Sequence, residues 1–284
     1  MIQFSNGHIF EYMTASGALG YDGKGWPWER PLSLIGLFDP TLFTSVTKTL
    51  TLHPMKGNLR WYNPFRCIRF LNDGVVNTVA LSNPGIDWWC KNISPSLDSR
   101  KIPLVVSLFG EPDELAKMAK MLNEFDIAGI ELNASCPNTT TTILQDTDRI
   151  IASCKAITAE TKLPLILKVS VSHDVEVITK GIVSMVQAIS INSVPWTKIF
   201  PNTRSPLTQL GGGGISGKVA QTMNWNLMKN ISDLTSIPVI GPSIWEFNDL
   251  EKVRTIGAKA ISFGSIFLRY PWRPTVYVRK EKQQ

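Results

Sequence analysis

Apolar segments of strand length alternate with longer amphipathic segments from about residue 100 onward. Residues 102–110 are apolar enough for a buried strand, and residues 112–125 carry apolar side chains at the three- and four-residue spacing of one helix face. The strands and helices expected after them are 129–134, 146–160, 164–170, 175–185, 188–194, 226–234, 238–241, 247–256 and 259–264. Repeated strand–helix units of this kind predict an α/β fold with a parallel sheet.

The N-terminal third of the chain is less regular. Residues 43–49 predict one strand, while segments 21–34 and 53–64, which are rich in Trp, Pro and Gly, predict loops over a pocket. An open doubly wound sheet would give the same alternation, but the chain lacks an early Gly-x-Gly-x-x-Gly turn followed by an acidic residue. A closed (β/α)8 barrel is therefore expected. Because single barrels commonly run to about 250 residues, residues 1–284 are expected to form one domain.

Composition narrows the range of partners. The formal net charge is +6, but the basic residues are scattered except at 279–282, so no nucleic-acid partner is expected. The chain has no run of about 18 apolar residues and no signal pattern, which predicts a soluble, cytoplasmic protein with no membrane partner. The four cysteines form no Cys-x-x-Cys pair and there are three histidines, so neither zinc nor an iron–sulfur cluster is expected.

A polar cluster follows the apolar segment 128–132, where the chain reads Asn133-Ala134-Ser135-Cys136-Pro137-Asn138. Because the carboxyl ends of barrel strands open onto one pocket, these side chains are expected at an active site. An amide can pair with a heterocycle, and a thiol with a pKa of roughly 8.5 can exchange a proton near neutral pH. Cys136 is therefore the candidate general base, and a buried structural thiol is the alternative.

Motifs spread over nearly the whole chain share their order and spacing with one enzyme family. They are Ala15-Ser16-Gly17, Thr47-Lys48-Thr49, residues 77–89, residues 131–138, Lys168, Asn192-Ser193, residues 213–217, Gly241, Gly257-Ala258 and Gly264-Ser265. On these motifs the chain resembles the dihydroorotate dehydrogenases, of the soluble class that uses cysteine rather than serine as catalytic base. The resemblance implies a (β/α)8 TIM barrel with FMN at its C-terminal mouth, which oxidises dihydroorotate to orotate in de novo pyrimidine biosynthesis.

The resemblance also implies roles for individual residues. Cys136 is the general base, and Lys48 lies between flavin and substrate and takes part in catalysis. The residues implied in substrate binding are Lys48, Asn77, Val79, Ala80, Leu81, Asn133, Asn138, Asn192 and Ser193. Those implied in FMN binding are Ala15, Ser16, Gly17, Lys48, Thr49, Asn133, Lys168, Gly213, Gly214, Gly217, Gly241, Ser243, Gly264 and Ser265, and no metal site is expected.

Two of these assignments also make sense from the residues themselves. Lys168 lies in the apolar segment 165–169, where a buried charge costs several kcal/mol unless a partner offsets it. An anionic reduced flavin would be such a partner, and solvation at a strand end is the alternative. The glycines at 211–214 allow a phosphate to approach the backbone closely, although four glycines in a row also suit a flexible loop.

The chain departs from the family pattern in its late and lid loops. Gly241-Pro242-Ser243-Ile244 is one residue shorter than the usual Gly-x-Gly-Gly-Ile, and Pro242 has no backbone N–H, so the Ser243 hydroxyl is expected to replace that donor. Threonines at 139–142 stand where relatives have a longer lid, and the loop around Trp26 and Trp28 is unfamiliar.

Two other functions stay open at this point. One is a related flavin oxidoreductase that acts on another uracil-like ring, including a dihydrouridine synthase acting on tRNA, although the set of asparagines favours dihydroorotate and no clustered basic face is visible. The other is a non-catalytic flavin-binding or empty barrel that serves as an interaction protein. For the electron acceptor, the resemblance allows fumarate or an electron-transfer subunit that passes electrons to NAD, and it implies a homodimer.

Overall fold

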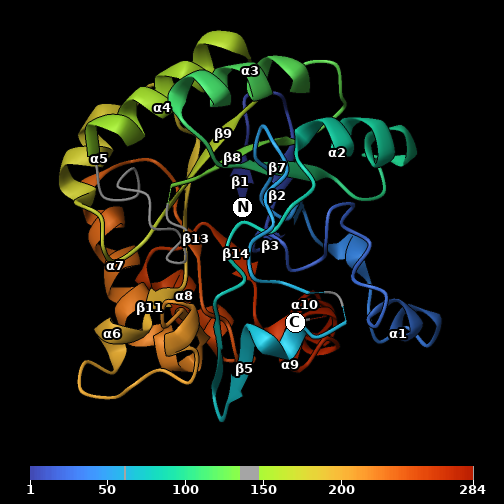
Figure 1. Cartoon of the computed structure of the whole chain (residues 1–284), viewed down its shortest axis with the longest axis vertical. Helices are drawn as coiled ribbons and strands as arrows, with labels where there is room; N and C mark the ends of the chain where they lie inside the picture. Colours follow the sequence, from blue (N-terminus) through green and yellow to red (C-terminus); the bar gives the residue numbers. More distant parts are fainter. Residues whose placement is uncertain (61, 135–146, 284) are drawn as a thin grey trace.

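The computed structural model describes residues 1–60, 62–134 and 147–283. Within these ranges the centre of the molecule is a curled parallel β-sheet in two parts, with helices around its outside (Figure 1). The larger part contains β4 (Ser45–Val46), β7 (Leu104–Leu108), β8 (Gly129–Asn133), β9 (Leu165–Val169) and β10 (Ala188–Ile191), and the smaller part contains β3 (Tyr12–Thr14), β13 (Ile240–Gly241) and β14 (Ala260–Phe263). The predicted α/β fold with a parallel sheet is confirmed.

Parallel bridges join the two parts of the sheet at both ends. One pairs Met13 in β3 with Thr44 next to β4, and the other pairs Ile189 in β10 with Val239 next to β13. The strands therefore follow one another in chain order around the curled sheet. Because all of these pairings are parallel, the carboxyl ends of the strands lie at one edge.

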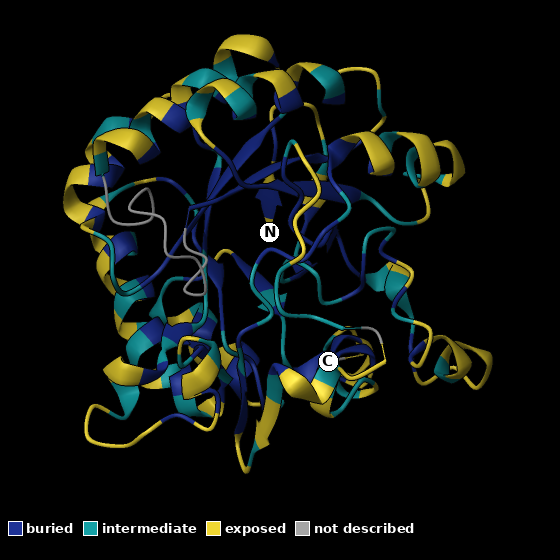
Figure 2. Ribbon diagram, viewed as in Figure 1, coloured by how far each residue is buried: buried dark blue, intermediate teal, exposed yellow. Residues whose placement is uncertain are grey.

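Helices cover the outer face of the sheet. They are α2 (Ile86–Asn92), α3 (Pro112–Leu122), α4 (Thr147–Glu160), α5 (Val175–Ile182), α7 (Gln221–Leu234), α8 (Asp249–Ile256) and α10 (Arg273–Glu281). Strands β7, β8 and β9 are buried at every position, which explains their mostly apolar sequences, while the helices expose their outer faces (Figure 2). No helix in the described part of the chain has the length and apolar character needed to cross a membrane.

The amino-terminal half of the sheet interior is filled with apolar side chains. Each of the strands except β8 contributes one inward residue to this cluster: Met13, Val46, Val105, Ile166, Ala188, Ile240 and Ala260. The hairpin of β1 (Ile2–Gln3) and β2 (Ile9–Phe10) covers the amino-terminal side of this cluster with Phe4 and Phe10, which are 2% and 5% exposed. Among the described residues, this apolar filling closes the amino-terminal end of the interior, and the carboxyl ends of the strands are the side open to a ligand.

An antiparallel sheet beside the carboxyl ends was not predicted. Its strands, in spatial order, are β11 (Val194–Pro195), β12 (Gly214–Gly217), β6 (Gly74–Asn77) and β5 (Ile68–Leu71). The run of glycines at 211–214 leads into β12. At Gly217 any side chain is excluded, because a Cβ atom there would lie 2.8 Å from the Gly74 Cα atom and the residue has a φ of 94°.

Some predicted boundaries are wrong. The strand predicted at 43–49 is restricted to Ser45–Val46. Beyond it the Thr47 and Leu50 N–H groups still donate hydrogen bonds to carbonyl groups of β7, but the chain is no longer a regular strand. Helix α7 begins at Gln221 rather than at 226, because its first turns are polar residues whose side chains bind a neighbouring loop instead of the apolar core.

The segment predicted as a loop at 21–34 contains a short helix, α1 (Arg30–Leu34), which buries no residue. Glu29, directly before it, is 0% exposed. Its Oε2 atom accepts a hydrogen bond from the Trp26 N–H at 2.8 Å, while its Oε1 atom has no partner in the described structure. Burial raises the pKa of Glu29 to about 7, and the Trp26 N–H opposes this rise.

This pKa predicts an unusual pH dependence of stability. Since the folded protein holds the Glu29 proton up to about pH 7 and the unfolded chain releases it near pH 4.5, the stabilising contribution is complete below that lower pH and is lost as the pH rises through 7. The free energy of unfolding of the wild type should therefore fall by about 3 kcal/mol between pH 4.5 and 8 on account of Glu29. Glu29→Gln should abolish this fall. Urea unfolding of both proteins at these two pH values measures the difference, and equal losses would show that Glu29 is not protonated in the folded state.

Candidate functional site

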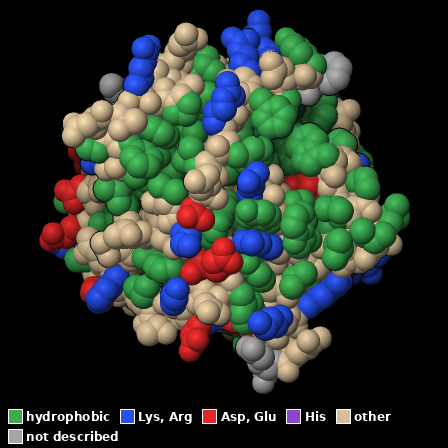
Figure 3. Space-filling model, turned by 90° about the horizontal axis from the view of Figure 1, so that it is seen from below, with side chains coloured by type: hydrophobic (Ala, Val, Ile, Leu, Met, Phe, Trp, Pro, Cys, Tyr) green, Lys and Arg blue, Asp and Glu red, His purple; other side chains and the backbone are tan. Residues whose placement is uncertain are grey.

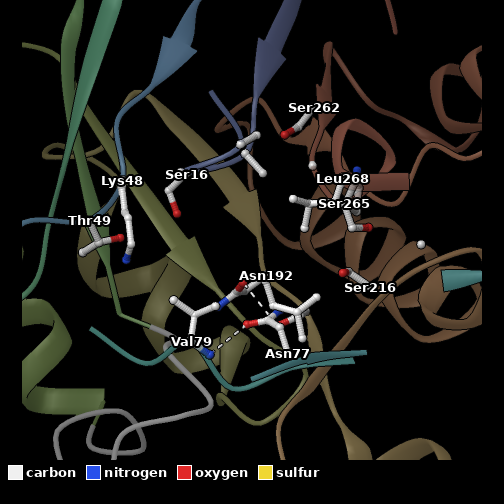
Figure 4. Close-up of a pocket in the computed structure, with 18 of the residues that line it drawn as sticks. Ser16, Lys48, Thr49, Asn77, Val79, Asn192, Ser216, Ser262, Ser265 and Leu268 are labelled. Atoms are coloured by element: carbon white, nitrogen blue, oxygen red, sulfur yellow. Dashed lines mark hydrogen bonds between the residues drawn. The ribbon is translucent and has the colours of Figure 1, made fainter. Parts of the chain in front are cut away.

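A cavity of about 560 Å³ opens at the carboxyl ends of the parallel strands. Its wall is built from residues at the carboxyl ends of β8, β9, β10 and β14 and from the segments that follow β3, β4, β10, β13 and β14, together with residues of the antiparallel sheet. Figure 4 shows three groups of side chains around it: Ser16, Lys48 and Thr49 on one side, Asn77, Val79 and Asn192 on a second, and Ser216, Ser262, Ser265 and Leu268 on a third. Residues from distant parts of the sequence therefore meet at one opening.

Most of the residues predicted for the site line this cavity. They are Ala15, Ser16, Gly17, Lys48, Thr49, Asn77, Val79, Ala80, Leu81, Asn133, Lys168, Asn192, Ser193, Gly217, Ser243, Gly264 and Ser265. Gly213 lies behind the wall against the Asn77 carbonyl, Gly214 is paired with Asn77 in the antiparallel sheet, and Gly241 packs against α8. Cys136 and Asn138 lie outside the described residues.

A buried ion pair lies beneath the cavity. The Lys168 Nζ atom is 2.9 Å from the Glu131 Oε1 atom, and the two side chains are 6% and 2% exposed. Lys168 also donates a hydrogen bond to the Ser16 hydroxyl. The lysine is a predicted site residue, but this protein partner on the neighbouring strand β8 was not predicted. The signal in the sequence was Glu131 itself, a second charged residue inside an otherwise apolar segment, which needs a partner of opposite charge.

Asn133 and Lys168 present complementary groups to the cavity. They are register partners on β8 and β9, and both line the wall. The Asn133 Nδ2 atom donates to the Thr49 hydroxyl at 2.9 Å, whereas its buried Oδ1 atom has no partner in the described structure. An ammonium has three hydrogens, and Lys168 directs two of them to Glu131 and Ser16. A donor and an acceptor thus remain side by side for a planar heterocycle.

A strained turn brings backbone groups to the second side of the cavity. Ala80 has a φ of 56°, an uncommon conformation for a residue with a side chain. The Val79 N–H donates to the Asn77 Oδ1 atom at 3.4 Å, and the Ser193 hydroxyl lies 3.4 Å from the Asn192 Oδ1 atom. The amides of Asn77, at the end of β6, and Asn192, directly after β10, therefore face the same space (Figure 4).

Gly17 determines where Lys48 lies. Gly17 has a φ of 77°, and a Cβ atom there would lie 3.3 Å from the Lys48 Cγ atom. The turn at residues 15–17 consequently packs on the aliphatic part of Lys48, whose backbone N–H is bonded to the Gly20 carbonyl at 2.7 Å. The lysine is 8% exposed and lines the cavity opposite the two amides.

The loop after β13 is held by helix α7. Ser243 has a φ of 63°. Its hydroxyl accepts a hydrogen bond from the Asn224 Nδ2 atom at 2.9 Å, and its carbonyl accepts one from the Gln221 Nε2 atom at 3.0 Å. Asn224 lines the cavity and its buried Oδ1 atom has no partner in the described structure. Asn224 is not among the predicted site residues, because it lies just before the helix that the apolar spacing predicts.

Aromatic side chains surround the outer part of the cavity. Trp26 and Trp28 are stacked with 5.4 Å between ring centroids and 2° between ring planes, and Phe65 meets Phe70 at 6.1 Å. The Arg269 guanidinium, at the end of α9 (Ile266–Arg269), lies 5.3 Å from the centre of the Phe70 ring. Seen from the side on which β5 and α9 lie, hydrophobic side chains gather with lysines and arginines between them (Figure 3).

The cysteines in the described ranges are poorly suited to proton transfer. Burial raises the pKa of Cys90 to about 11 and that of Cys154 to about 12, and it also raises the pKa of Cys67, where Lys48 opposes the effect. These thiols stay protonated near neutral pH. No cluster of three or more His, Cys, Asp or Glu side chains suited to a metal occurs among the residues that the structure describes.

Comparison with known proteins agrees with the motifs. The family described as dihydroorotate dehydrogenase matches residues 37–270. A protein of Pelobacter propionicus named dihydroorotate dehydrogenase B (NAD(+)), catalytic subunit, is 32% identical over 265 residues, which cover 89% of this chain and 82% of the relative. A protein of the same name from Desulforudis audaxviator is 31% identical over 91% of this chain and 83% of the relative. The chain therefore belongs to the dihydroorotate dehydrogenase family.

Proposed function

We propose that this chain oxidises dihydroorotate to orotate with FMN as its cofactor. Membership of the family supports the reaction. The single observation that supports FMN as the cofactor is the pair formed by the Asn133 Oδ1 acceptor and the Lys168 ammonium at the cavity wall. A flavin ring presents donors and acceptors along one edge, so it would satisfy both groups. Without a ligand there, a buried acceptor would be left unpaired at a cost of about 1–3 kcal/mol.

The proposal includes the fold and the domain organisation. We interpret the curled sheet, with its bridges from Met13 to Thr44 and from Ile189 to Val239, as a (β/α)8 TIM barrel that residues 1–284 form as one domain. The apolar cluster at the amino-terminal end supports this interpretation, because barrel interiors are filled with layers of side chains below the active site. FMN would be bound at the C-terminal mouth.

Individual residues would hold FMN along the wall. The flavin ring would fit the inner side of the cavity, which is lined by Ser16, Gly17, Thr49, Asn133 and Lys168. The phosphate would lie at the late loops, where barrel enzymes bind phosphate and where this chain has Ser243, Gly264 and Ser265. The Ser243 hydroxyl, which accepts a hydrogen bond from Asn224, can donate its own hydrogen to a phosphate there. When bound there, FMN would supply an acceptor for the hydride that leaves the substrate.

The remaining residues would bind and deprotonate the substrate. The amides of Asn77 and Asn192 can pair with both N–H and C=O groups of a pyrimidine ring, and the turn at residues 79–81 offers backbone N–H groups to a carboxylate. Lys48 adds a positive charge for the same anion. Cys136 would take the proton from the ring carbon next to the carbonyl, and Asn138 would complete the set of amides.

We further propose that electrons leave through an electron-transfer subunit. The relatives are named as catalytic subunits of an NAD(+)-linked enzyme, a name that implies further subunits, and the exposed aromatic rim around the cavity is a suitable docking surface. Fumarate at the substrate site is the alternative acceptor. The homodimer and the cytoplasmic location expected from the sequence stay predictions.

The first test concerns the cofactor. FMN rather than FAD should copurify with the protein, because the late loops offer one phosphate site and the chain lacks a dinucleotide motif. Cofactor released by heat can be identified by chromatography against both standards. Release of FAD, or failure of the apoprotein to bind FMN, would contradict the proposal, and anaerobic bleaching of the flavin by dihydroorotate would exclude a non-catalytic barrel.

The second test concerns the base. Cys136→Ala should lower the rate of flavin reduction by dihydroorotate by about two to four orders of magnitude, with little change in orotate binding, because the thiol acts on a proton in transit. Cys136→Ser should be intermediate. Stopped-flow reduction should quicken with rising pH in the wild type until the thiol ionises and should lose this dependence in Cys136→Ala. Cys154→Ala is the matched control, and a rate in Cys136→Ala within a few-fold of wild type would assign the proton to another group.

A further inference from the structure

Glu131 is a buried carboxylate that lies below the cavity wall and not on it. It is 1% exposed, and its neighbour in the register of β7 is Ser107. Its Oε1 atom accepts hydrogen bonds from Lys168 and Ser107, both at 2.9 Å, and its Oε2 atom accepts one from Ser190 at 3.1 Å. Strands β7, β8, β9 and β10 thus each contribute one polar side chain to a single network.

Stability alone is a weak reason for such a network. Removing two charges from water costs about as much as their attraction returns, and apolar residues of similar volume often replace buried ion pairs without loss. The network does, however, fix the position of the Lys168 ammonium. The Lys168 ammonium is fixed between the Glu131 carboxylate and the Ser16 hydroxyl, which leaves its third hydrogen for the cavity, beside the Asn133 Oδ1 atom.

We propose that Glu131 is the positioning residue for Lys168 and that its charge sets the reduction potential of the bound flavin. This inference rests on the FMN site proposed above. With both residues ionised, the floor of the site carries no net charge, so the lysine can donate a hydrogen bond to the flavin without strongly favouring its anionic reduced form. Glu131 acts through the lysine and does not touch the ligand.

Opposite shifts follow for the two partners. Glu131→Gln leaves an uncompensated ammonium below the flavin, so the midpoint potential should rise. Lys168→Met leaves an uncompensated carboxylate, so the potential should fall. Each single variant should change the equilibrium constant for two-electron reduction by at least about tenfold, which corresponds to about 30 mV. The double variant should lie between the two, near the wild type.

A conservative variant separates charge from position. Glu131→Asp keeps the charge but withdraws the carboxylate by one methylene, so the ammonium loses its fixed place. The potential should stay close to that of the wild type, while the FMN dissociation constant of the apoprotein should rise by about tenfold or more, as for the loss of one charge-assisted hydrogen bond. Quenching of flavin fluorescence on titration into apoprotein measures this constant.

Glu281→Gln is the matched control. Glu281 is also an ion-paired carboxylate, bonded to Arg254 and to the Tyr12 hydroxyl at the amino end of β3, on the side of the sheet away from the cavity. This variant should change neither the potential nor the FMN affinity. Potentials are measured at pH 7 by equilibration with a reference dye, and thermal unfolding of each apoprotein records any loss of stability.

Each outcome decides the inference. Shifts of opposite sign in Glu131→Gln and Lys168→Met, with recovery in the double variant, support it. A Glu131→Gln potential equal to that of the wild type overturns it and leaves the proposed FMN site intact. Failure of both Glu131→Gln and Glu131→Asp to fold would show that the carboxylate is structural, and failure of wild-type apoprotein to bind FMN would overturn the proposed cofactor together with this inference.

Discussion

The site depends on one constraint, which is that a parallel sheet can hold a lysine in its interior only if neighbouring strands satisfy the charge. Lys168 meets this requirement through Glu131 on the next strand and through the Ser16 hydroxyl, while the Ser107 hydroxyl donates to Glu131. Burial of an ammonium without such partners would cost several kcal/mol. The position of the charged layer therefore determines where the apolar filling ends and where the cavity begins.

The alternation of side chains along each strand builds these two layers. Residues two positions apart point to the same side of a sheet, so each strand that contributes one apolar residue to the lower cluster contributes its next inward residue to the layer above. Val105 is followed in this way by Ser107, Ile166 by Lys168, and Ala188 by Ser190. The same step leads from Val46 to Lys48 and from Ala260 to Ser262, and both of these residues line the cavity. A shift of one residue in register would move these side chains to the other face of the sheet. The same strand register therefore determines both the packing of the core and the positions of the site residues.

The parts of the fold that depend on local sequence pattern are predictable from the sequence. The apolar spacing of α3 and the mostly apolar segments of β7 to β9 require no distant information, and the structure confirms them as a helix and strands. The Lys168–Glu131 pair could not be read in this way, because the partners are 37 residues apart in the chain and meet only through the register of β8 and β9. The hairpin of β5 and β6 was missed although Asn72-Asp73 before Gly74 is a turn signal, since both strands are short.

The late loop shows how a departure from the family pattern is compensated. Pro242 removes a backbone donor, and Ser243 takes a left-handed conformation that normally favours glycine, at a cost of about 1 kcal/mol or more. Helix α7 offsets this cost with three side-chain donors: Trp225 to the Pro242 carbonyl at 3.0 Å, Gln221 to the Ser243 carbonyl, and Asn224 to the Ser243 hydroxyl. The first turns of α7 are polar for this reason. Polar groups of a helix thus hold the loop in place by donating to its oxygen atoms, where a glycine-rich segment would be freer to move.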